Sequence, residues 1–296
     1  MNDLQSALQN WEDKFRQDPR SDEQIITLAL SKDPDADAES EEYWLTIGLL
    51  QHRFPEILPR VGDLLRCEDQ KNREAAAYIL GQSRCSAKWD ARQCAGLLAA
   101  AASHEKAPRP LAAMLHAMGH LHDESVIPTS VAFRQHEDSE VRLAVTHTLS
   151  QFENPEAIQA LIELSADSNY DVRNWATFNL GSMIDTDTPA IRDALAARLH
   201  ETECEALGEA IVGLARRGDV RLMPPLMDLF DTLDRDDLRS WIIMMEVIDE
   251  LAERTVAKSE QVWLPALRRA EQIGFGDREE LRKALLAYPP TPNLTP

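Results

Sequence analysis

The feature that most constrains the fold is an internal repeat. Residues 138–167 align with residues 169–201 at a shift of roughly 31 positions, which places Val141 on Val172. A unit of this length accommodates one helical hairpin, and a hairpin alone cannot bury its apolar face. It must stack on its neighbours, so the sequence predicts a repeat array rather than two separate globular domains.

Within each repeat, the first segment has the hydrophobic period of an α-helix. From Val141 onward, apolar residues recur at i, i+3, i+4, i+7 and i+8, which places them on one buried face. Weaker copies occur at 70–83, 108–121 and 203–230. Strand-like alternation of apolar and polar residues is absent from the sequence. The prediction is therefore an all-α fold, a right-handed α-solenoid in which helical hairpins stack into a superhelix.

Prolines and small residues mark the ends of the expected helices. Proline opens the second helix of several repeats, where a first-turn residue needs no backbone donor: Pro55, Pro155 and Pro189. Small residues after the first helix are interpreted as tight helix ends: Gly81, Gly119 and Gly181. The repeat array is assigned to residues 43–235. Residues 1–42 are expected to form acidic N-terminal capping helices and a loop, and residues 236–296 divergent C-terminal capping helices with a frayed, proline-rich tail.

The charge of the chain restricts its partners. It carries 51 acidic and 31 basic residues, a formal net charge of −20. Such a surface disfavours nucleic acid and anionic membranes and attracts basic proteins, although the same charge also serves simply to keep an elongated surface in solution. The N-terminus lacks an export signal, and no apolar run reaches the roughly 18 residues of a membrane span. We therefore expect a cytoplasmic protein whose cysteines are free thiols.

Several of these residues together resemble a known repeat family. The Asp-Val-Arg start of segment 171–181, the alanine four residues after Val172, the terminal Leu-Gly and the proline-opened second helix are similar to the HEAT-like repeats of phycobilin lyase subunits. The resemblance covers residues 40–235. More narrowly, segments 171–181, 191–200 and 209–230 resemble bacterial HEAT-repeat proteins encoded beside Rhs-type polymorphic toxins, which implies an immunity protein.

Five residues are interpreted as structural: Arg73, Arg142, Asp171, Arg173 and Trp175. Asp171, at a helix start, is expected to accept backbone N–H groups and to face the positive end of the helix dipole. The arginines occupy one position in successive repeats, and the resemblance to HEAT-like repeats implies that Asp/Arg pairs tie one repeat to the next. Trp175 is expected on the buried side of its helix, where the sister repeat has alanine.

Five other residues are the candidates for binding a partner: Tyr78, His116, His147, Asn174 and Phe178. At about 100° per residue, positions two and six residues before the last buried leucine of the first helix point away from the core. On the concave side of a solenoid, such aromatic and imidazole side chains would supply interface anchors. The alternative is that strong curvature brings successive first helices together and buries these side chains between them.

Catalytic and metal-binding motifs are weak throughout the sequence. His116, His120, His122 and Asp123 contain an i, i+4 histidine pair, but the general-base glutamate of a zinc protease is missing. The acidic segment 33–42 lacks the glycine and the final glutamate of a calcium loop. Bilin-lyase-like activity and DNA glycosylase activity are the enzymatic alternatives, and the negative charge argues against the second. We expect no catalytic residue, no metal and no cofactor.

The sequence therefore favours a non-catalytic, protein-binding HEAT-repeat protein. The function implied by the resemblance is immunity: the protein would bind a basic domain of a polymorphic Rhs-type toxin and occlude its active site. It would be monomeric when unbound and would contact neither nucleic acid nor membrane. The alternative is a scaffold or adaptor that bridges other proteins. The sequence does not choose between the two, and it does not name the partner or its reaction.

Overall fold

The fold is built from helices in two compact units. The computed structural model describes residues 15, 17–31, 40–54, 56–82, 90–150, 152–201, 204–232, 238–275 and 277–289. Within these ranges the chain contains no β-strand, which confirms the all-α prediction. The two units are Met1–Ser150 and Gln151–Pro296, called here the N-terminal and C-terminal units. Their boundary lies within the predicted repeat array.

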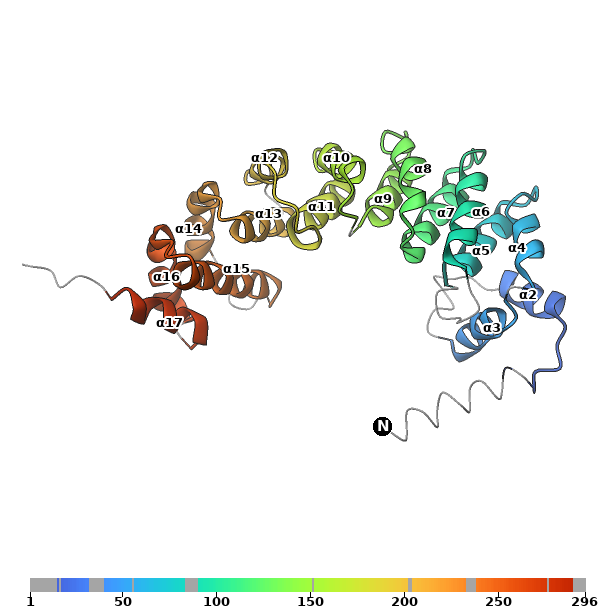
Figure 1. Cartoon of the computed structure of the whole chain (residues 1–296), viewed down its shortest axis with the longest axis horizontal. Helices are drawn as coiled ribbons and strands as arrows, with labels where there is room; N and C mark the ends of the chain where they lie inside the picture. The colour runs from blue at the N-terminus through green and yellow to red at the C-terminus, as the bar shows by residue number, and fades with distance from the viewer. Residues whose placement is uncertain are drawn as a thin grey trace, which may run out of the picture. The chain divides into compact units, whose positions relative to one another are not determined.

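The N-terminal unit is a layered stack of helical hairpins. Its helices are α2 (Asp22–Leu30), α3 (Glu41–His52), α4 (Leu58–Leu64), α5 (Gln70–Gly81), α6 (Ala91–Ala102), α7 (Pro108–Leu121), the 3₁₀ helix η2 (Glu124–Val126), α8 (Ile127–Ala132) and α9 (Ser139–Thr148). The first helices of successive repeats, α5, α7 and α9, pack side by side (Figure 1). The second helices α6 and α8 contact each other in a separate layer.

The C-terminal unit repeats this arrangement. It contains α10 (Pro155–Leu164), α11 (Tyr170–Phe178), the π-helical segment η3 (Asn179–Met183), α12 (Pro189–Ala197), α13 (Cys204–Arg217), η4 (Val220–Leu222), α14 (Met223–Thr232), α15 (Leu238–Ala257), η5 (Gln261–Trp263), α16 (Leu264–Ala270), η6 (Glu271–Phe275) and α17 (Glu279–Ala287). The first helices α11, α13, α15 and α17 pack successively, and α10 and α12 lie along the edge above α11 and α13 in Figure 1. Stacked hairpins of this kind form an α-solenoid, as predicted.

Local sequence signals determine where the helices begin. Asp138 caps α9 by accepting the backbone N–H of Glu140, and Pro155 and Pro189 are the first residues of α10 and α12. Pro55 lies outside the described residues. The expected buried face is also present, because the side chain of Val141 is 0% exposed. Burying one such side chain stabilises the fold by about 1.5–3 kcal/mol.

The small residues near the ends of the first helices have a different role from the one we predicted. A Cβ added at Gly81 would lie 2.9 Å from Cα of Ala117, and one at Gly181 would lie 2.6 Å from the carbonyl oxygen of Glu209. At Gly119 the nearest backbone atom would be 3.0 Å away. None of these three glycines has a positive φ. They are not left-handed helix ends; they let the backbones of successive first helices approach closely.

The remaining expectations for the chain are tested only in part. The acidic segment 32–39 and the tail 290–296 lie outside the described residues. Cys67 and Cys94 are free thiols as expected, whereas Cys85 and the side chain of Cys204 are not described. No helix in the described part of the chain has the length and apolarity needed to cross a membrane.

Candidate protein-interaction site

The arginines of the repeat signature join consecutive repeats. Nε of Arg73 donates to Oε2 of Glu105 at 2.6 Å, while its Nη1 donates to the carbonyl oxygens of Cys67 and Glu68. Glu105 precedes α7, the first helix of the next repeat, and Cys67 and Glu68 precede α5. The guanidinium group therefore connects the loops that lead into two successive first helices, which is the role that the sequence suggested for Arg73.

Arg173 makes the same contacts in the C-terminal unit. It donates to both carboxylate oxygens of Glu201 and to the carbonyl oxygens of Asp167 and Ser168. Arg142 likewise donates to the carbonyl oxygens of the loop before α9. These contacts agree with the structural interpretation of the arginines. The acidic partners of Arg73 and Arg173 are glutamates of the following loop, however, and not the aspartate at the start of the helix.

Asp171 does not cap its helix. Asn169 is the N-cap of α11, and its side-chain oxygen accepts the backbone N–H of Val172 at 3.1 Å. Asp171 lies inside the first turn, where its side chain is exposed. The reason is the register of the helix, which begins at Tyr170, one residue before Asp171. Its charge still faces the positive end of the helix dipole.

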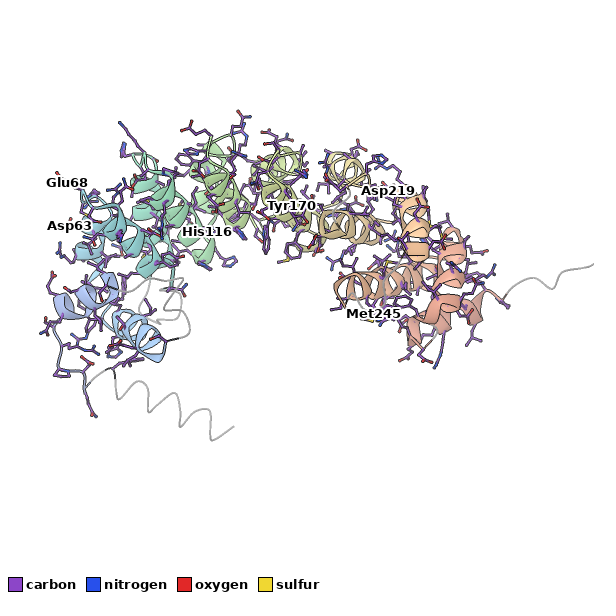
Figure 2. The ribbon with its side chains drawn as sticks, turned by 180° about the vertical axis from the view of Figure 1, so that it is seen from behind. Asp63, Glu68, His116, Tyr170, Asp219 and Met245 are labelled. Atoms are coloured by element: carbon purple, nitrogen blue, oxygen red, sulfur yellow. The ribbon has the colours of Figure 1, made fainter. Side chains whose placement is uncertain are left out.

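Two candidate binding residues of the N-terminal unit have their rings in contact. The rings of His116 on α7 and His147 on α9 lie 5.0 Å apart between centroids and are tilted by 43°. Both are partly buried. Tyr78, His116 and His120 line a cavity of about 160 Å³ beside this pair. Figure 2 labels His116 on α7. Contact between successive first helices thus covers these side chains in part, as the alternative interpretation anticipated.

The burial of the two imidazoles suppresses their protonation. Desolvation, together with repulsion from the neighbouring His147 and His120, lowers the pKa of His116 to about 4. Desolvation, with a contribution from His120, also lowers the pKa of His147. Both rings are therefore neutral at neutral pH. The described residues contain no group of three or more metal-ligating side chains placed to hold an ion.

In the C-terminal unit, Trp175 is exposed rather than buried. Its side chain is 40% exposed, and its ring contacts Phe178 edge-to-face, with 5.6 Å between centroids and 88° between planes. The small residue Ala144 is fully buried at the equivalent position of the preceding repeat. The prediction that Trp175 belongs to the core is therefore wrong.

Asn174 and Phe178 are placed differently from what helix geometry alone suggested. Both side chains are partly buried. Oδ1 of Asn174 is a buried acceptor that receives no hydrogen bond from the described residues. Phe178 supports the ring of Trp175. The exposed aromatic surface of α11 is thus a pair of rings, with Trp175 as its outer member.

Two arginines that the sequence analysis did not consider hold the C-terminal unit together. The side chain of Arg217 is 4% exposed and donates to the carbonyl oxygens of Gly213, Ile184 and Thr186. Burial lowers the pKa of this guanidinium group. Arg254 pairs with Glu260 and donates to the carbonyl oxygen of Arg216. The only sequence signal for such a role is a basic residue at the end of an otherwise apolar helix.

Comparison with known proteins identifies a repeat family in part of the chain. Residues 95–181 match the family model described as HEAT repeats. The stacked hairpins of both units define an α-solenoid, and this match identifies HEAT repeats within residues 95–181.

The chain is also similar to particular proteins. It is 27% identical to Protein YibA of Escherichia coli strain K12 over 198 residues, which cover 64% of this chain and 68% of that protein. The X-ray structure of YibA from E. coli superposes with a TM-score of 0.64 at 23% identity and covers 91% of this chain and 97% of that one.

A structure described as showing that Kap95p binding induces the switch loops of RanGDP to adopt the GTP-bound conformation has a TM-score of 0.59 at 14% identity. It covers 96% of this chain and 42% of that one, and the likeness is one of fold alone.

Proposed function

We propose that this protein is a non-catalytic, protein-binding solenoid that acts as an immunity protein against a polymorphic toxin. It would bind a basic toxin domain with one-to-one stoichiometry and cover the active site of that domain. The resemblance of segments 171–181, 191–200 and 209–230 to HEAT-repeat proteins encoded beside Rhs-type toxins supports this proposal. The protein would act in the cytoplasm, as a monomer when unbound.

One observation carries the proposal: the exposed ring of Trp175, in contact with the partly buried Phe178, lies on a strongly acidic protein. Exposed aromatic side chains are typical anchors of protein interfaces, because they bury a large area and lose little conformational freedom. A net charge of −20 accelerates the encounter with a basic domain and disfavours acidic partners. The other binding candidates, Tyr78, His116, His147 and Asn174, would contribute through the first-helix surfaces of their own units.

The required affinity follows from the function. An immunity protein must outcompete the substrate of the toxin at low concentration, which corresponds to a Kd of about 1 nM or lower, or about −12 kcal/mol. Electrostatic attraction would make the association rate fall as ionic strength rises. Loss of an aromatic anchor would instead accelerate dissociation.

Co-expression tests the proposal. The gene is expressed together with the toxin domain encoded beside it, and cell survival is measured with the wild type, Phe178→Asp and Val220→Asp. Val220 is the matched control, because it is 53% exposed and lies in η4, away from α11. The expected result is protection by the wild type and by Val220→Asp, and its loss with Phe178→Asp, provided that circular dichroism shows intact helices. Failure of the wild type to protect would refute immunity and leave an adaptor role as the explanation of the exposed pair.

A further inference from the structure

The arginine of the repeat signature is replaced by leucine in α13. Arg73, Arg142 and Arg173 each lie seven positions before a fully buried leucine of their first helix. On α13 the residue seven positions before the fully buried Leu214 is Leu207. A leucine side chain has no hydrogen-bond donor. α13 therefore lacks the contacts by which Arg73 and Arg173 join the loops of successive repeats.

Leu207 lines an open groove in the C-terminal unit, called here the α12–α14 groove. Its volume is about 620 Å³, and residues of α12, α13, η4 and α14 surround it. The apolar part of the lining consists of Ala196, Leu199, Leu207, Pro224, Pro225 and Leu229. Leu207 is partly exposed, whereas Leu111, at the corresponding position of α7, is 1% exposed. The groove thus leaves apolar surface of α13 accessible to solvent.

The corresponding cavity of the N-terminal unit has a different chemistry. It has a volume of about 500 Å³, and Arg73 of α5 lines it together with Glu105. These two side chains form an ion pair at 2.6 Å and are 14% and 5% exposed. Each charge at the base of that cavity is therefore matched within the protein. At the base of the α12–α14 groove, Leu207 offers an apolar surface instead.

The rim of the α12–α14 groove is acidic. Asp228 of α14 lines the groove and is exposed. Arg221 lines it as well, but its Nη1 donates to Oδ1 of Asp193 at 2.7 Å and its Nη2 to Oδ2 of Asp219 at 2.6 Å. Figure 2 labels Asp219. One guanidinium group is shared by two carboxylates, and Asp228 adds a further negative charge, so the rim attracts cations and repels anions.

The open shape of the groove favours a segment of a protein over a small molecule. Half of the rim and lining is exposed to solvent, namely His200, Arg221, Pro224, Asp228 and Thr232. A small-molecule site covers roughly 70–90% of the surface of its ligand. An open groove instead receives side chains that project from a larger surface. Burial of an apolar side chain against the leucines of the groove would be favourable, because it removes apolar surface of both partners from water.

We propose that the α12–α14 groove is a docking site for a segment of a basic protein partner in which a bulky apolar side chain lies next to a lysine or an arginine. The apolar side chain packs on Leu207 and Leu229, and the neighbouring cation faces Asp228. This proposal rests on the proposed protein-binding function and adds to it a contact site on α12, α13 and α14.

Methyl NMR of the full-length protein tests the proposal. Leucine methyl groups are labelled with carbon-13, and the resonances of Leu207 and Leu229 are assigned from Leu207→Met and Leu229→Met. Three short peptides are titrated at about 0.15 M salt, where charges more than about 8 Å apart are largely screened. The first carries leucine between lysines, the second carries leucine between glutamates, and the third carries serine between lysines.

We expect the lysine–leucine peptide to shift the methyl resonances of Leu207 and Leu229. It should bind about two- to fivefold more tightly than the glutamate–leucine peptide, because its cations meet the acidic rim. It should bind about tenfold or more tightly than the lysine–serine peptide, because serine buries little apolar surface.

Two variants separate the apolar base of the groove from its charged rim. Leu207→Arg introduces the residue of the repeat signature and should weaken the lysine–leucine peptide about tenfold or more. Val256→Arg, at a 44% exposed position of the same unit, should leave the affinity unchanged. Asp228→Lys should reduce the preference for lysine over glutamate about twofold or more. Glu253→Lys makes the same charge change at an exposed position of α15 and should not alter the preference.

Three results would overturn the docking site. The first is equal affinity for the three peptides, and the second is a set of shifts confined to leucines outside the groove. The third is binding of the apolar dye anilinonaphthalene sulfonate at the methyl groups of Leu207 and Leu229 without binding of the lysine–leucine peptide, which would indicate a small-molecule cavity. If Leu207→Arg does not fold, the peptide preference of Asp228→Lys still decides, because Asp228 is exposed.

Failure of the docking site is distinguishable from failure of the proposed function. If the wild type protects cells from the toxin but the lysine–leucine peptide does not bind the groove, the docking site is refuted and the immunity role stands. If the peptide binds the groove as expected but protection fails, the docking site stands and the immunity role is refuted.

Discussion

The replacement Gly81→Ala is expected to destabilise the N-terminal unit, although alanine forms helices better than glycine. The new Cβ would lie 2.9 Å from Cα and 3.0 Å from Cβ of Ala117, whereas ordinary contacts are 3.4–4 Å. The contact atoms belong to the backbone of α7 and its first side-chain atom, so no flexible side chain can move away. α5 and α7 would have to separate by about 0.5 Å, which weakens the packing of the buried residues between them by a quarter or more of its dispersion energy.

The magnitude follows from two opposing effects. Replacing glycine by alanine in a helix stabilises by about 1 kcal/mol at most. Overpacking of this kind costs about 1–3 kcal/mol. We therefore expect a net loss of up to about 2 kcal/mol in the free energy of unfolding. Urea denaturation followed by far-UV circular dichroism measures this loss. The slope of the free energy of unfolding against urea concentration should stay unchanged.

Gly96→Ala is the matched control in the same unit. Gly96 is an exposed residue within α6, and a Cβ added there would meet no atom within 4 Å. This variant should be more stable than the wild type by about 0.5–1 kcal/mol. The two replacements are chemically identical and should have opposite signs. If Gly81→Ala also stabilises the protein, the close approach of the first helices is not what requires glycine at this position.

Three further predictions concern the histidines, the arginines and the tryptophans. Because burial lowers the pKa of His116 to about 4, the unfolded chain binds this proton more readily, so stability should fall as pH drops from about 6.5 toward 4. His116→Gln should flatten the dependence of Tm on pH, and an unchanged slope would contradict this assignment. Arg73→Ala should cost about 3–5 kcal/mol in urea denaturation, because it leaves the carboxylate of Glu105, which is 5% exposed, without its cation. Trp175→Ala should lower the free energy of unfolding by less than about 1 kcal/mol, whereas Trp263→Ala, at a fully buried position, should lower it by about 3–5 kcal/mol. Similar losses for the two variants would show that Trp175 belongs to the core.

Glu105 shows why the arginine contacts could be predicted only in part. Burial alone would raise the pKa of its carboxyl group, but hydrogen bonds from Arg73 and from the backbone of Ala107 and Lys106 hold the pKa below its ordinary value. The sequence placed an arginine at the same position in successive repeats and suggested a bridge between repeats. It did not reveal the acidic partner, because Glu105 lies in a loop that comes close to Arg73 only when the hairpins stack.

The binding candidates show the same limit. Helix periodicity placed Phe178, His116 and His147 away from the buried face. In the structure each of these side chains is partly buried and not fully exposed. Hydrophobic periodicity distinguishes only two sides of a helix, one that faces the core and one that faces solvent. In a solenoid a first helix also has neighbours on both flanks, and these cover a side chain according to how closely the helices approach.

The sequence by itself determined the all-α class, the hairpin repeat and the starts of α10 and α12, because hydrophobic period and first-turn prolines act within a few residues along the chain. Only the tertiary structure decided that Gly81 and Gly181 serve close helix contacts and that Trp175 turns outward. These outcomes depend on the distance between helices whose residues are far apart in the sequence. The space between two such helices is filled by side chains from both segments, and no local pattern in either segment specifies how closely they pack.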